Sequence, residues 1–159
     1  MVHSDFLRMD IVHDDVAEGC DPLRDEDGTI LAWKKNIFSF PPIGEPGGGA
    51  HVTAGDLDRF LRKVNAGSLL SLQSTRAFFT PQVFHHAVDD WDQMYGHGLW
   101  FAVNRAGEVM FAEKEGVNAG VSAVIRCYLD QDVNVVLLAN IQGHEEEPLT
   151  TIHRLLTAG

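Results

Sequence analysis

The stretch YGHGLWFAVNRAGEVMFAEKEGVNAGVSAVIRCYLDQDVNVVLLAN, residues 95–140, decides the fold. Short runs rich in β-branched and aromatic residues alternate in it with turn signals, and this pattern is typical of β-strands joined by tight turns. The expected strands are residues 99–103, 108–114, 121–128 and 134–139, and the expected turns are residues 104–107, 116–120 and 130–132. Such an order predicts an antiparallel meander.

Three helices are predicted around this meander. The first begins at the cap Thr53 and carries one apolar stripe at helical spacing, Leu57, Phe60, Leu61 and Val64. The second begins at the cap Ser71 and stops before Thr80-Pro81, because the residue before a proline disfavours the helical region. The third is opened by Pro148 near the C-terminus. Segregated helices and strands predict an α+β fold with an antiparallel sheet.

The remaining segments are predicted to be mostly irregular. Residues 1–28 have no clean period, a turn at 25–28 precedes a short strand at 29–33, and residues 36–50 and 81–97 are expected to be loops. We therefore expect one domain over 1–159. It would consist of an irregular lead with a Gly/Pro loop (1–50), a helical part (51–97), and the sheet with the C-terminal helix (98–159). The apolar strand 133–138 is expected to be buried on both faces.

Charge and hydropathy exclude several classes of partner. The net charge is −11, from 12 basic and 23 acidic residues. Nucleic acids and anionic membrane surfaces would repel such a chain. There is no run of 18 apolar residues, and the N-terminus lacks the basic and apolar segments of a signal peptide. The localisation is left open, with a cytoplasmic preference.

No cofactor or metal is expected. The Gly47-Gly48-Gly49 run lacks the Gly-Lys-Ser/Thr ending of a phosphate-binding loop. The adjacent His85 and His86 are expected to point apart, so they would not share a metal. Two cysteines are too few for a disulfide framework, and Cys127 is expected to be a small buried side chain.

Lys114-Glu115-Gly116 is the candidate site for chemistry, because a lysine at a strand end beside a glycine-rich turn is accessible. Several segments, this one included, resemble segments that occur in the same order in one enzyme family. They are Gly47 to Phe60, Leu69 to Ser71, Phe79 to Gln82, Tyr95 to Leu99, Lys114 to Gly116 with Gly120, and Val135 to Asn140. Residues 1–10 also look like a segment of that family.

The chain resembles the C-terminal half of the serine β-lactamase-related family, which includes class C β-lactamases, penicillin-binding DD-peptidases and related esterases. The resemblance implies a partial β-lactamase/transpeptidase-like fold. It also implies that Lys114 lends positive charge to the substrate carboxylate and to the proton network. The backbone N–H of Val117, which follows Gly116, would be one oxyanion donor.

The chain also departs from that family. It contains neither a Ser-x-x-Lys nucleophile motif nor a Tyr-x-Asn motif, and Glu115 stands where β-lactamases often have Thr or Ser. A serine nucleophile needs an adjacent base and an oxyanion site. The expectation is therefore a fragment of a hydrolase that is inactive alone, with Lys114, Gly116 and Val117 as a vestigial wall.

Two alternatives stay open. The chain could complete a hydrolase site with a second chain and then act on a small ester or amide, or it could be a non-enzymatic interaction module. In the latter case the module would reuse the sheet and contact a ligand through Lys114 without covalent chemistry. For the chain in isolation, Lys114 could also be an ordinary surface lysine that ends a strand. The expected sheet would be left with exposed edges and apolar faces that this chain covers only in part. Such surfaces favour self-association, so we also expect a homo-oligomer.

Overall fold

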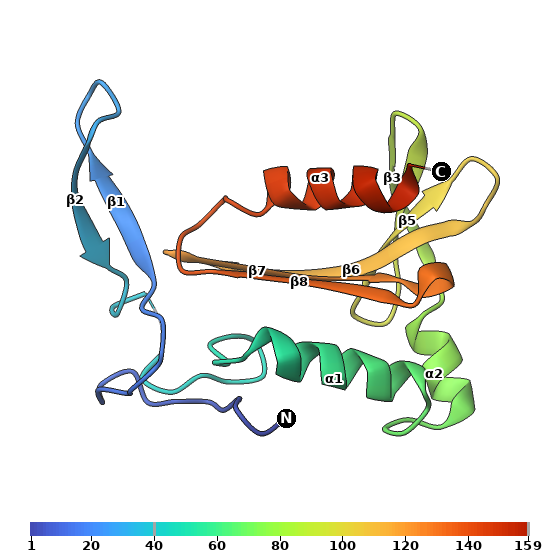
Figure 1. Cartoon of the computed structure of the whole chain (residues 1–159), viewed down its shortest axis with the longest axis horizontal. Helices are drawn as coiled ribbons and strands as arrows, with labels where there is room; N and C mark the ends of the chain where they lie inside the picture. The colour runs from blue at the N-terminus through green and yellow to red at the C-terminus, as the bar shows by residue number, and fades with distance from the viewer. Residues whose placement is uncertain (40, 159) are drawn as a thin grey trace. The chain divides into compact units, whose positions relative to one another are not determined.

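The computed structural model describes residues 1–39 and 41–158, and Figure 1 traces its elements. The elements in chain order are β1 (Cys20–Arg24), β2 (Ile30–Lys35), α1 (Ala54–Asn65), α2 (Leu72–Phe78), β3 (Val83–Val88), β4 (Trp91–Tyr95), β5 (Trp100–Asn104), β6 (Val109–Asn118), β7 (Val121–Tyr128), β8 (Val133–Ala139) and α3 (Glu146–Thr157). β1 and β2 form a two-stranded antiparallel sheet, and β3 to β8 form a six-stranded sheet in sequence order. The predicted α+β class and meander are confirmed.

The prediction of a loop at residues 81–97 is wrong. β3 and β4 pair there in antiparallel register, from Val83 opposite Tyr95 to Val88 opposite Trp91. The acidic residues of this segment suggested a loop. Asp89 and Asp90 in fact make only the turn between the strands. Apart from the half-buried Val88, β3 is exposed along its length, so its polar side chains remain in solvent.

Two other strand boundaries differ from the prediction. β6 continues through Gly116 to Asn118, so the turn is shorter than predicted and comprises Ala119 and Gly120. β1 lies within the lead that was predicted to be irregular. Its Pro22 pairs with Trp33 in a sheet of only two strands, where a missing N–H is tolerated.

The helices agree with the prediction more closely. The Ser71 side chain caps α2 by accepting a hydrogen bond from the Ser74 N–H, at 3.1 Å. Leu61 and Val64 of the predicted stripe on α1 are buried. α3 begins at Glu146, two residues before Pro148, which occupies its first turn.

The chain forms two compact units. The first comprises residues 1–2, 54–115 and 124–136, and the second comprises residues 3–53, 116–123 and 137–159. A core in the first unit consists of Leu99, Phe101, Val103 and Ala112. Phe78 and Phe79, at the end of α2, pack against this core. This packing anchors the C-terminal end of α2 to the sheet.

Strand β8 is less buried than the sequence predicts. Its residues are half-buried, and Leu138 is 41% exposed. The prediction that β8 is buried on both faces is therefore wrong for this chain. A run of apolar residues predicts that both faces of a strand pack against other elements, but those elements need not belong to the same chain.

Candidate functional site

Lys114, Gly116 and Val117 lie on β6, and all three are exposed. The prediction that Lys114 ends a strand is wrong, because β6 runs four residues further, to Asn118. Successive side chains of a strand point to opposite faces, so Lys114 is on the opposite face of β6 from Glu113. The structure thus places the predicted site residues along one strand.

Gly116 is not required by close packing in the described part of the chain. A Cβ atom added at Gly116 would meet no atom within 4 Å. The next residue, Val117, has a side chain that is 50% exposed although it is apolar. This end of β6 therefore offers accessible backbone and apolar surface.

An ion pair fixes Glu113, the residue before Lys114. Arg126 on β7 (Val121–Tyr128) donates from Nε to Glu113 Oε2 at 2.9 Å, and both side chains are nearly buried. The Arg126 guanidinium also lies 4.0 Å from the centre of the Phe111 ring. A guanidinium between a carboxylate and an aromatic face is strongly restrained, so this contact fixes β6 beside Lys114. No local pattern in the sequence predicts this ion pair.

The β6–β7 turn is tied to the segment that was predicted to be irregular. Cys20 N donates to Gly120 O at 3.2 Å, and the buried Asn36 donates from its side chain to Ala119 O. Gly120 has φ +67°, and a Cβ there would lie 2.6 Å from Cys20 N, so glycine is required. The resemblance had singled out Gly120, but nothing in the sequence connected Asn36 to it.

The glycine-containing segment before β5 is equally constrained. A Cβ at Gly96 would lie 2.7 Å from the Phe101 ring and 2.9 Å from Thr80 O. Gly98 has φ +90°, which favours glycine. These conformations fix the position of His97 between the two glycines.

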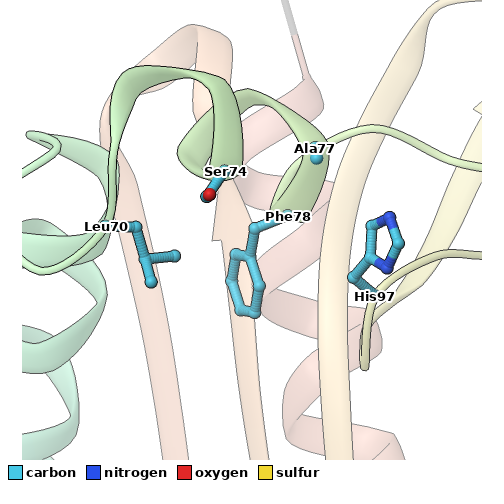
Figure 2. Close-up of a pocket in the computed structure, with 5 residues that line it drawn as sticks. All are labelled: Leu70, Ser74, Ala77, Phe78 and His97. Atoms are coloured by element: carbon cyan, nitrogen blue, oxygen red, sulfur yellow. The ribbon is translucent and has the colours of Figure 1, made fainter.

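One pocket of about 300 Å³ lies beside His97. Figure 2 shows the Phe78 ring between the side chains of Leu70 and His97. Ser74 also lines this pocket, and its Oγ accepts a hydrogen bond from Ser71 Oγ at 2.9 Å. Lys114 is not among the lining residues, so this pocket is separate from the predicted site.

The cysteines are free, and Cys127 supplies no evident nucleophile. Cys127 is buried, and burial, with a smaller contribution from the Asp58 carboxylate, raises the pKa of its thiol to about 11. A thiol with this pKa is protonated at neutral pH. Within residues 1–39 and 41–158 no three His, Cys, Asp or Glu side chains gather as metal ligands, and no helix is long and apolar enough to cross a membrane.

The fold resembles that of a solved penicillin-binding protein. The crystal structure of the penicillin binding protein from Bacillus halodurans matches with a TM-score of 0.82 and 30% sequence identity. The match covers 96% of this chain and 44% of that chain, so this chain spans less than half the length of that protein. No protein-family model matches the chain, and no curated protein matches its sequence. The similarity supports a penicillin-binding-protein-like fold.

Proposed function

We propose that this chain supplies the Lys114 wall of a serine acyl-transfer site, and that a Ser-x-x-Lys segment outside these 159 residues supplies the nucleophile. One observation carries the proposal: the fold matches part of a penicillin-binding protein over 96% of the chain. The Lys-Glu-Gly motif, which the family resemblance singles out, lies on the exposed C-terminal half of β6.

The exposed groups of β6 suit such a role. An accessible ammonium at Lys114 would attract a substrate carboxylate and stabilise negative charge that develops during acyl transfer. The empty space at the Cβ position of Gly116 would let a substrate lie against the backbone. The N–H of Val117 would then be one oxyanion donor, and the backbone of the missing nucleophile would provide the other.

The proposed substrate is a small ester or amide. Glu115 replaces the hydroxyl residue that is frequent in β-lactamases, and a carboxylate beside Lys114 weakens the attraction for an anionic β-lactam. Alone, the chain is expected to hydrolyse no substrate, because it contains no Ser-x-x-Lys.

The test compares the purified chain with the chain co-expressed with a polypeptide that carries the Ser-x-x-Lys half of the resembled family. Hydrolysis of nitrocefin and p-nitrophenyl acetate is measured, together with covalent labelling by a fluorescent penicillin. We expect no turnover by the chain alone and ester hydrolysis by the complemented pair. In that pair, Lys114→Ala should lower kcat/KM by roughly 10²-fold, as for removal of one electrostatic group in an acyl-transfer site.

Lys63→Ala is the matched control, because Lys63 is also exposed but lies on α1. It should leave the activity of the complemented pair unchanged. Turnover by the chain alone would contradict the claim that the nucleophile lies outside it. Equal effects of the two lysine substitutions would contradict the proposed role of Lys114.

A further inference from the structure

A β-bulge on the edge strand β3 brings two histidines together. Phe84 pairs with Met94, whereas His86 pairs with Gln93, so His85 is an extra residue in the ladder. In a regular strand the side chains of neighbouring residues would point to opposite faces, but a bulge redirects one of them. The expectation that His85 and His86 point apart is therefore wrong.

The two imidazole rings face each other through the same type of nitrogen. His85 Nδ1 and His86 Nδ1 are 2.6 Å apart, and both side chains are exposed. The ring centres are 4.8 Å apart, with 70° between the ring planes. At this distance one Nδ1–H donates a hydrogen bond to the other Nδ1. Once neither Nδ1 carries the proton, each offers a lone pair, and two exposed lone pairs this close can bind one cation.

Aromatic packing holds the His85 ring in this orientation. Its centre lies 4.9 Å from that of Trp100, with the rings nearly perpendicular at 78°. Trp100 in turn packs against Tyr95, with centres 4.6 Å apart. A ligand whose ring is already oriented loses less conformational freedom when it binds a cation.

We propose that His85 and His86 form a bidentate site for a late first-row divalent cation, with Cu²⁺ as the preferred ion. Imidazole suits copper, nickel and zinc, and Cu²⁺ binds most tightly in the Irving–Williams series. Two ligands at about 2.0–2.1 Å from a metal lie about 2.9 Å apart when they subtend a right angle. The observed 2.6 Å is closer to this tetragonal spacing than to a tetrahedral one.

The remaining coordination positions would be filled by water, because in the described part of the chain no third potential ligand joins the pair. Binding also requires that the imidazole whose Nδ1 carries the proton changes to the Nε2-protonated tautomer. Mg²⁺ and Ca²⁺ should not bind, since they prefer oxygen ligands.

The test is a titration of the 159-residue protein with CuCl₂, followed by calorimetry and by tryptophan fluorescence. We expect Cu²⁺ binding that quenches Trp100, which contacts His85. His85→Asn and His86→Asn should each weaken binding at least roughly tenfold, since loss even of groups that only support a ligand costs this much. Trp100→Phe should reduce the amplitude of quenching.

His97→Asn is the matched control, because His97 is an exposed histidine of the same unit outside the pair. The affinity of the His97→Asn variant for Cu²⁺ should equal that of the unsubstituted protein. Circular dichroism establishes that each variant is folded. Unchanged affinity in a folded His85→Asn or His86→Asn variant, or an equal loss in His97→Asn, would overturn the proposal.

Discussion

At the scale of single residues, Cys127 links burial to ionisation. The buried thiol has its pKa raised to about 11, first by desolvation and then by the Asp58 charge. The folded protein therefore holds this proton more tightly than the unfolded chain does. Its contribution to stability is fully present below about pH 9 and is lost as the pH rises toward 11.

We predict that a thiol reagent at pH 8 modifies Cys20 readily and Cys127 only after unfolding, because Cys20 is half-buried and Cys127 is buried. Labelling with 5,5′-dithiobis-(2-nitrobenzoic acid) should count one thiol in the native protein and two in denaturant. The Cys20→Ser variant is the control and should show none while folded. Rapid labelling of that variant would disprove the prediction.

Residue-level features differ in how far the sequence predicts them. The Ser71 cap and the burial of Cys127 could be predicted, because both depend on local pattern. Asp56 is fully buried, although aspartate rarely is. It accepts the Val2 N–H at 3.2 Å and pairs with Arg59, and the contact with Val2 joins residues 54 positions apart. Such a contact leaves no local signal.

At the scale of elements, one hydrogen bond ties α1 to β8. Asn134 donates from Nδ2 to Asp58 Oδ1 at 2.9 Å. This bond, and then the Arg62 guanidinium, lowers the pKa of the Asp58 carboxyl. The stabilisation is present at pH values above the ordinary aspartate pKa, about 3.9, and is lost as the pH falls through the lowered value.

We predict that Asn134→Ala raises the pKa of Asp58 and lowers the free energy of unfolding by about 1 kcal/mol at neutral pH, since the carboxylate is partly exposed. The deficit should shrink in acid, where Asp58 is protonated. NMR titration measures the pKa of Asp58, and urea unfolding at several pH values measures the free energy of unfolding. A deficit that is the same at every pH would contradict the role of the carboxylate, and Asn65→Ala at the end of α1 is a suitable control.

Helices and strands were predicted best where the sequence pattern of apolar residues matches the side chains that are buried. β7 has the predicted bounds, 121–128, because its apolar run lies between clear turn signals. β3 was missed because it is an exposed edge strand, and its polar residues carry no alternation of burial. Gly116 suggested a turn, but β6 continues past it to Asn118, although its pairing with β5 ends at Glu113.

At the scale of the whole molecule, exposed apolar surface on an edge strand predicts self-association. Val83 and Phe84 on β3 are 62% and 57% exposed, and β3 is an end strand of the six-stranded sheet. Unpaired edges with apolar side chains recruit further strands. We therefore expect a homodimer or larger oligomer.

Light scattering coupled to gel filtration, over a wide range of concentrations, tests this prediction. Phe84→Lys should shift the protein toward monomer, because a charged edge strand resists pairing. The control is Leu155→Lys on α3, which is similarly exposed, at 70%, but lies in a helix. A monomer at the highest concentration would show that the edge is not used.

The fold class and the likeness to a penicillin-binding-protein fold could be predicted from the sequence. Lys114, Gly116 and Val117 were proposed as site residues from a local motif, and the structure places them on β6. The Arg126–Glu113 pair and the Asn36 contact depend on how distant strands meet, which no sequence window contains.

The contact between Asn36 and Ala119 also bears on the order of folding. The two residues are 83 positions apart, so their hydrogen bond closes a long loop. The entropy of loop closure grows with the logarithm of length, at about 0.6 kcal/mol for each doubling, and contacts of high sequence separation slow folding. The turn at the end of β6 thus acquires this support only when the N-terminal part of the chain has come back to it, whereas the β6–β7 hairpin itself can form from neighbouring residues.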